Sequence, residues 1–69
     1  MRLSARNQIP GTIRDVDLGS VMARVTVEII GGHTLTSTIT RDAVTELGLA
    51  SGDEVTVVIK STEVMIGKE

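Results

Sequence analysis

The 69-residue chain contains no cysteine and no aromatic residue, and it has a single histidine and a single proline. Without cysteine it has no disulfide framework, zinc ribbon or thiol chemistry, which fits a reducing compartment. Without aromatic side chains it offers no platform on which nucleic-acid bases could stack. With a net charge of −2, the chain also lacks the broad positive field that holds a DNA backbone. The composition therefore disfavours a nucleic-acid partner.

Long apolar runs and signs of a second unit are also missing. No stretch approaches the ~18 apolar residues of a membrane-spanning helix, and the opening Met1–Arg2–Leu3 does not start a signal peptide. Because there is no linker, internal repeat or low-complexity tract, residues 1–69 are predicted to form a single domain. We therefore expect a soluble, cytoplasmic protein with no membrane partner.

β-Branched residues dominate what is present: valine, isoleucine and threonine account for 25 of the 69 residues. Their stiff side chains pack well on pleated surfaces. A chain of this size buries only about 60% of the surface that its unfolded form exposes. Since disulfides and aromatic core residues are unavailable as supplements, we expect a β-rich subunit that gains stability by associating with copies of itself.

Hydrophobic periodicity predicts an all-β fold with one short helix. The Gly31–Gly32 pair indicates a hairpin, and Pro10–Gly11 indicates an edge, a bulge or a bend because proline has no N–H to donate. Thr40 and Gly48 are placed to cap the two ends of the helix. The order of elements favours a small five-stranded, partly closed Greek-key barrel of the OB type. The predicted segments are strands at 3–18, 21–30, 33–40, 55–59 and 64–66, and a helix at 41–47.

Few residues could carry out catalysis. The only histidine, His33, follows the glycine pair and is interpreted as an exposed loop residue. No second histidine or cysteine exists to complete a nucleophilic triad or a metal cluster. The carboxylates are scattered, and the glycine pair lacks the spacing and lysine of a phosphate-binding loop. We therefore expect no enzyme, no catalytic residue, no metal-ion site and no cofactor.

Two short polar segments are better suited to binding a small oxyanion. Ser4–Asn7 is rich in hydrogen-bond donors and has no obvious capping role, and Lys60–Thr62 ends an apolar strand with a cation and two hydroxyl groups. Arg and Lys supply charge, serine supplies O–H donors, and backbone N–H groups supply further directions. The alternative interpretation is that Arg6 and Lys60 are solvated surface charges beside turn-forming serines.

Four motifs together resemble one family over almost the whole chain, from about Leu3 to Ile66. The sequence is similar to the molbindins, the small Mop proteins of bacterial molybdate handling, through the motifs Ser4–Gln8, Gly31–Gly32, Thr38–Thr40 and Lys60–Ile66. The resemblance implies an OB-like subunit assembled into a homohexamer, a trimer of dimers, with the N-terminal strand exchanged between partners. It also implies non-covalent binding of molybdate or tungstate at subunit interfaces, for molybdenum storage, buffering or delivery.

The resemblance also implies which residues bind the oxyanion. Ser4 and Arg6 would come from one subunit and Lys60 and Ser61 from its neighbour, with backbone N–H groups around Ala5 and Ser61 as further donors. Thr40, before the short helix, matches another family contact, and a helix N-terminus favours an anion. Some relatives have a serine where this chain has Ala43, so one hydroxyl donor is missing at that corner. The predicted binding residues are Ser4, Ala5, Arg6, Thr40, Lys60 and Ser61.

Two alternatives come from other classes of protein. The segments around Thr40 and from Leu47 to Val55 are also similar to the swapped-hairpin β-barrel of small DNA-binding transcriptional regulators, but the seven basic residues form no patch. The other alternative is a structural oligomerisation module that binds no ligand. Salt-dependent binding to duplex DNA would favour the regulator, and stabilisation by an oxyanion would favour the molbindin.

Overall fold

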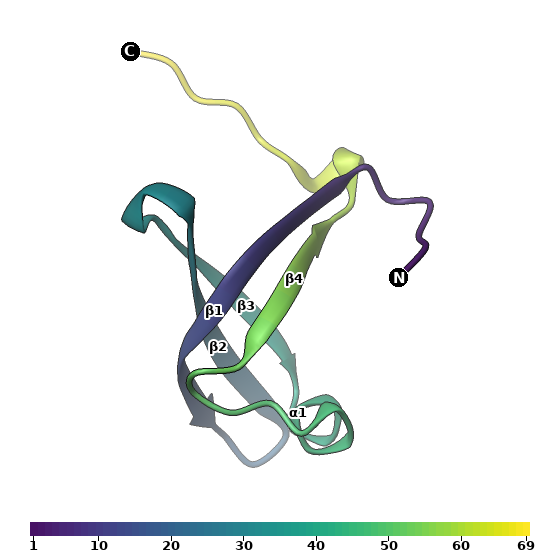
Figure 1. The fold of residues 1–69 in the computed structure, drawn as a ribbon, viewed down its shortest axis with the longest axis vertical. Helices are drawn as coiled ribbons and strands as arrows, with labels where there is room; N and C mark the ends of the chain where they lie inside the picture. The colour runs from purple at the N-terminus through teal and green to yellow at the C-terminus, as the bar shows by residue number, and fades with distance from the viewer.

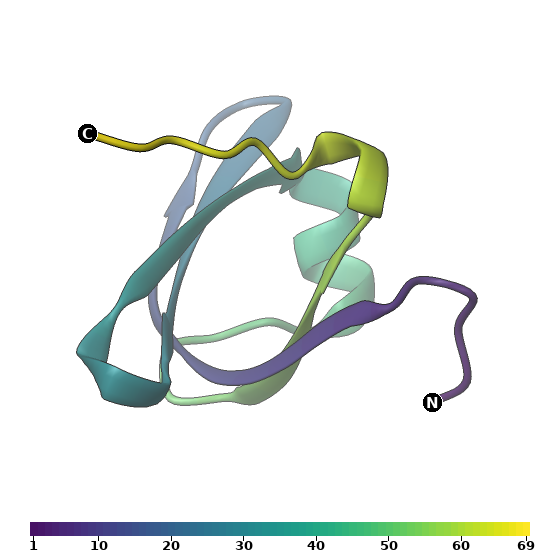
Figure 2. The same ribbon diagram turned by 90° about the horizontal axis from the view of Figure 1, so that it is seen from above.

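A single curled antiparallel sheet and one short helix make up the computed structural model, which describes all residues 1–69 (Figure 1). The sheet has the strand order β3-β2-β1-β4, so that β3 and β4 are its two open edges. Seen from above, the strands wrap part of the way around an interior and leave a gap (Figure 2). The elements are β1 (Asn7–Leu18), β2 (Met22–Ile29), β3 (Thr34–Thr40), α1 (Arg41–Leu47) and β4 (Glu54–Ile59), with 3₁₀ turns η1 (Ile30–Gly32) and η2 (Ser61–Glu63).

The all-β, OB-like fold is confirmed, but the chain contains four strands, not five. The segment expected to form the last strand, Val64–Ile66, leaves η2 without pairing to any strand of the same chain (Figure 1). Met65 and Ile66 are 92% and 89% exposed. The apolar pattern that predicted a strand is therefore present, but one chain provides no partner strand for it.

The interruption predicted at Pro10–Gly11 is a change of partner within one continuous strand. Pro10 pairs only with Thr56 of β4, whereas pairing with β2 starts at the next residue, Gly11, opposite Ile29. Proline therefore occupies the stretch of β1 that has an open side, where a missing N–H breaks no ladder. The bulge in β1 lies further along, between Ile13 and Asp15.

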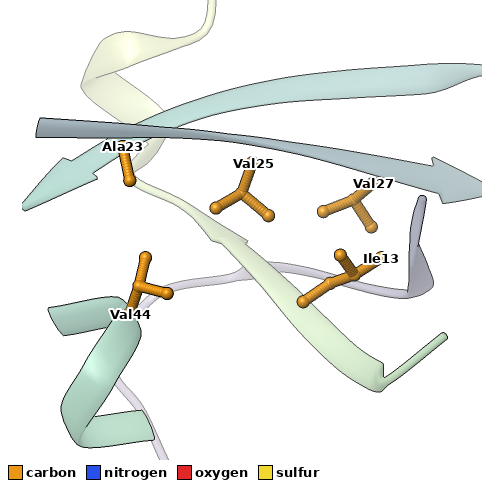
Figure 3. Packing of buried hydrophobic residues seen from close by; sticks show 5 residues of the cluster. All are labelled: Ile13, Ala23, Val25, Val27 and Val44. Carbon is orange, nitrogen blue, oxygen red and sulfur yellow. The ribbon is translucent and has the colours of Figure 1, made fainter. Parts of the chain in front are cut away.

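The buried core is small and consists of aliphatic residues from β1, β2 and α1. The side chains converge beneath the curled sheet, with Val44 of the helix facing the row from β2 (Figure 3). The alternation predicted for β2 is confirmed, although Val21, expected on the inward face, lies before the strand and is 69% exposed. The core residues are Ile13, Ala23, Val25, Val27 and Val44.

The helix has the predicted boundaries and caps, and the hairpin turns at the predicted glycine pair. Its strands are shorter than predicted, because β2 ends at Ile29, β3 begins at Thr34, and η1 lies between them. Thr40 accepts a hydrogen bond from the Ala43 N–H through Oγ1 at 3.1 Å, and Gly48 ends the helix in the left-handed region at φ 63°. At the β2–β3 connection Gly31 and Gly32 both have positive φ, which glycine adopts without a Cβ clash. These features place Thr40 at the junction of β3 and α1.

Candidate oxyanion site

The two donor-rich segments leave the sheet next to each other, because the β1–β4 ladder ends between them. The last pair of this ladder is Asn7 opposite Ile59. Arg6 precedes Asn7 and Lys60 follows Ile59, so the antiparallel register places these two cations at neighbouring positions of one chain. Figure 1 shows the N-terminal segment and η2 at the same end of the β1–β4 pair. The resemblance assigns these segments to two different subunits, and within one chain they leave the same end of the β1–β4 pair.

Two side-chain hydrogen bonds hold this end of the ladder in place. The Asn7 Nδ2 group donates to the Ile59 carbonyl at 3.2 Å, across the two strands. The Gln8 Nε2 group donates to the Ala5 carbonyl at 2.7 Å and fixes the segment that precedes β1. The sequence pattern alone indicates no such structural role for Asn7 or Gln8. One sequence signal could have revealed these two roles. Asn7 and Gln8 are consecutive amide residues, and they stand where the donor-rich segment ends and the predicted strand continues.

Apart from Asn7, the side-chain donors of the two segments are exposed and form no hydrogen bond within the chain. None of the side-chain hydrogen bonds involves Ser4, Arg6, Lys60 or Ser61. Neither cation forms an ion pair, and the nearest acidic residue in sequence is Glu63, inside η2. This end of the molecule therefore presents positive charge and hydroxyl groups that are free to bind an anion.

The arginines of β1, β2 and α1 are, by contrast, engaged with carboxylates or carbonyls. Arg14 donates two hydrogen bonds to Glu28, at 3.2 and 3.0 Å, and these bonds lower the pKa of the Glu28 carboxyl. Arg24 pairs with Asp17 at 3.0 Å, and the Arg41 guanidinium donates to the Gly19 carbonyl. The free cations are therefore concentrated near the chain termini and at the end of the β1–β4 ladder.

Thr40 is not part of this group within one chain. It ends β3 beside α1, whereas Lys60 and Ser61 follow the far end of β4 (Figure 1). Its Oγ1 accepts the capping hydrogen bond from Ala43, which leaves its O–H free to donate. Within one chain, five of the six predicted residues therefore belong to the two segments that leave one end of the β1–β4 pair, and Thr40 lies at the end of β3.

The concave surfaces of the chain lie elsewhere. A hollow of about 590 Å³ is lined by residues of β1, β2, η1 and β4. Its lining includes Glu28 and Glu54 but no basic residue, so its chemistry does not suit an anion. No group of three or more His, Cys, Asp or Glu residues could hold a metal ion, and His33 is exposed beside the η1 turn. None of the helices has the length and apolar character needed to cross a membrane.

The chain is thus a small module with an OB-like sheet and two donor-rich segments at one end of its β1–β4 ladder. The TOBE domain family matches residues 3–66. The chain is 50% identical over 66 residues to molybdenum-pterin-binding protein 1 of Clostridium pasteurianum, covering 96% of this chain and 97% of that protein. It superimposes on MopII of Clostridium pasteurianum with a TM-score of 0.93 at 48% identity, covering 97% of this chain and all of the other.

A third similarity is to the cytoplasmic molybdate-binding protein ModG in a molybdate-bound form, with a TM-score of 0.84 and 46% identity. This match covers 88% of the present chain and 43% of ModG. The chain therefore belongs to the TOBE domain family and, within it, to the Mop proteins. The resemblance found in its motifs is confirmed, and the molybdenum compound that its relatives bind is a ligand, not a cofactor.

Proposed function

We propose that the chain binds molybdate or tungstate without catalysing a reaction, and that it serves in the cytoplasm to store, buffer or deliver the oxyanion. The observation that carries the proposal is the pair of unpaired cations, Arg6 and Lys60, brought together by the end of the β1–β4 ladder. Membership of the Mop proteins and the cytoplasmic, molybdate-bound ModG relative support the ligand and the location.

Five of the six residues have these parts in the proposed site. Arg6 and Lys60 neutralise the charge of the dianion, Ser4 and Ser61 donate through their hydroxyl groups, and the Ala5 N–H adds a backbone donor. A dianion also allows two like charges to lie close together, because it attracts both. The overall charge of −2 does not oppose binding, since exposed charges are screened beyond about 8–10 Å.

The position of Thr40 is the reason to propose that the site lies between copies of the chain. Within one chain this threonine is at the other end of the fold from the cations (Figure 1). A second copy can place its Thr40 hydroxyl against the anion held by Arg6 and Lys60 of the first. A homohexamer built as a trimer of dimers, as the resemblance implies, would contain several such interfaces, and exchange of β1 between copies stays a prediction.

The donor set favours fully deprotonated oxyanions. Arg, Lys, hydroxyl and N–H groups all donate, and neither segment contributes a carboxylate next to the cations. Hydrogen phosphate would bring a proton that finds no acceptor, which is unfavourable for a buried group. Sulfate has no such proton, so its discrimination from molybdate has to come from the size of the site.

Calorimetric titration of molybdate into the wild type, Arg6→Ala and Arg2→Ala tests the proposal. Arg2 is the matched control, because it is also an exposed arginine in the N-terminal segment without an ion pair. Losing a charge-assisted contact is worth roughly 1.5–3 kcal/mol, so affinity should fall at least tenfold in Arg6→Ala and remain unchanged in Arg2→Ala. Equal affinities for the wild type and Arg6→Ala would overturn the proposed site.

A further inference from the structure

We propose that Gln8 is a positioning residue for the oxyanion site, because its side chain holds the peptide group between Ala5 and Arg6 in an orientation that suits an anion. The inference rests on the proposed function, since it concerns the same donor segment. It assigns Gln8 no contact with the oxyanion and so adds a residue that lies outside the proposed donor set.

The donor segment before β1 is tied to the rest of the chain by a single hydrogen bond. Residues 1–6 lie outside the sheet, and the backbone bends at Ser4 and at Arg6. None of the backbone hydrogen bonds outside the helices and strands involves these six residues. Among the side-chain hydrogen bonds, only the one from Gln8 Nε2 to the Ala5 carbonyl, at 2.7 Å, reaches them. Gln8 therefore makes the one hydrogen bond that orients this segment.

Gln8 and its neighbour Asn7 act on different parts of the chain, because successive side chains of a strand point to opposite faces. Asn7 is half-buried, and its Nδ2 group donates across the sheet to the Ile59 carbonyl at the last pair of the β1–β4 ladder. Gln8 is exposed and bonds back to Ala5, three residues earlier. Asn7 thus fixes where the ladder ends, and Gln8 fixes the path of the chain beyond that end (Figure 1).

The hydrogen bond from Gln8 sets the polarity of the Ala5–Arg6 peptide group. The C=O and N–H of a planar trans peptide point in opposite directions. With the Ala5 carbonyl held by the Gln8 amide, the Arg6 N–H is directed to the other side, and it has no acceptor within the chain. A carbonyl oxygen facing an anion would repel it, whereas a free N–H attracts it. Gln8 thus occupies an acceptor and leaves a backbone donor free, which preserves the donor-only character of the site.

An orientation that is fixed before the anion arrives should raise the affinity. Fixing the backbone of a residue costs conformational entropy, and a segment already held in its bound conformation does not incur this cost on binding. The hydrogen bond is local and exposed, and neither Gln8 nor Ala5 belongs to the buried core. Loss of the Gln8 donor should therefore lower the affinity for molybdate about tenfold and leave the stability of the fold almost unchanged.

The variant Gln8→Met tests this role, because methionine keeps the length and unbranched shape of glutamine but has no N–H to donate. The matched control is Thr56→Met, which places the same side chain at an exposed position of β4 that forms no side-chain hydrogen bond. Calorimetric titration of molybdate measures the affinity, and chemical denaturation without oxyanion measures the stability. We expect about tenfold weaker binding for Gln8→Met, wild-type affinity for Thr56→Met, and denaturation midpoints close to that of the wild type for both.

NMR relaxation of the backbone amides reports the order of the segment directly. Without oxyanion, the Arg6 amide of the wild type should be as ordered as the amides of β1, and it should become more mobile in Gln8→Met. Saturating molybdate should restore its order in the variant. A purely structural role for Gln8 would instead lower the denaturation midpoint, with unchanged affinity and unchanged mobility of the Arg6 amide, and this result would overturn the inference.

The titrations separate a failure of this inference from a failure of the proposed function. Equal molybdate affinities of the wild type and Gln8→Met would overturn the inference, while the oxyanion site would stand if Arg6→Ala still binds at least tenfold more weakly. A wild type that gives no heat with molybdate would overturn the proposed function, and the role of Gln8 with it.

Discussion

Among the glycines, Gly11 is the one at which an added Cβ atom would come closest to its neighbours. A Cβ atom at this position would lie 2.6 Å from Val27 Cγ1 and 2.8 Å from the Glu28 carbonyl oxygen. Val27 is part of the buried core and the carbonyl belongs to the backbone of β2, so neither can move away without disturbing the ladder. The requirement for glycine here comes from close approach of two strands, since Gly11 is not among the glycines with positive φ.

Gly11→Ala should therefore destabilise the fold. Overpacking of a well-packed core costs about 1–3 kcal/mol, and this variant should show a lower denaturant midpoint with an unchanged slope. Gly67→Ala is the control, because a Cβ atom added there would meet nothing within 4 Å and Gly67 does not have a positive φ. A midpoint for Gly11→Ala equal to that of the wild type would contradict the close packing of β1 against β2.

The donor residues of the candidate site could be proposed from the sequence, but the arrangement of their segments could not. Arg6 and Lys60 could be selected because each lies in a short segment that combines a cation with hydroxyl groups. Neither segment has an obvious capping role in the sequence. Their proximity depends on the register that ends at Asn7 and Ile59, which is set by contacts between segments about fifty residues apart in the chain. Such long-range pairing has no local signature, so only the structure shows that one chain places the two segments side by side.

Among the elements, α1 and β2 were predictable because their signals are local. The helix has a capping threonine, an acidic first turn and a closing glycine, and β2 has strict alternation. The strand expected at 64–66 was predicted by the same local rule, but a strand also needs a neighbour. The four-stranded sheet of one chain offers none on that side of η2, which is why the element is missing from the single chain.

Thr40→Ala is expected to weaken the first turn of α1. The variant removes the oxygen that accepts the Ala43 N–H, and loss of such a cap costs about 1 kcal/mol. Thr40→Ser keeps the hydroxyl group and should retain most of the stability, while Thr38→Ala removes an exposed threonine from the same strand without touching a cap. Chemical denaturation compares the three variants, and a Thr40→Ala protein as stable as Thr38→Ala would contradict the capping role.

For the whole molecule, the proposed site links ligand binding to stability. A ligand that binds only the folded state stabilises it by mass action, by about 2.7 kcal/mol at a hundredfold excess over the dissociation constant. The small aliphatic core makes this contribution large relative to the stability expected of a domain of this size. If the proposed site is correct, folding, assembly and oxyanion binding are coupled through residues of the segments that leave the end of the β1–β4 ladder.

Thermal unfolding should therefore depend on the identity of the oxyanion. Molybdate and tungstate are expected to raise the midpoint of the wild type by several degrees, and phosphate at the same concentration and ionic strength by much less, because its proton has no acceptor. The molybdate effect should disappear in Lys60→Ala. Equal stabilisation by phosphate and molybdate would show that the anion acts through general screening and not through the donor-only site.

A crystal of the assembled protein soaked in tungstate would show where the oxyanion binds, because tungsten can be located by its anomalous scattering. We expect a tungsten peak at a boundary between two copies, with its oxygen atoms in hydrogen-bonding range of Arg6 and Lys60 of one copy and of Thr40 of the other. A peak at a different location only, or a boundary with no tungsten at saturating concentration, would contradict the proposed site.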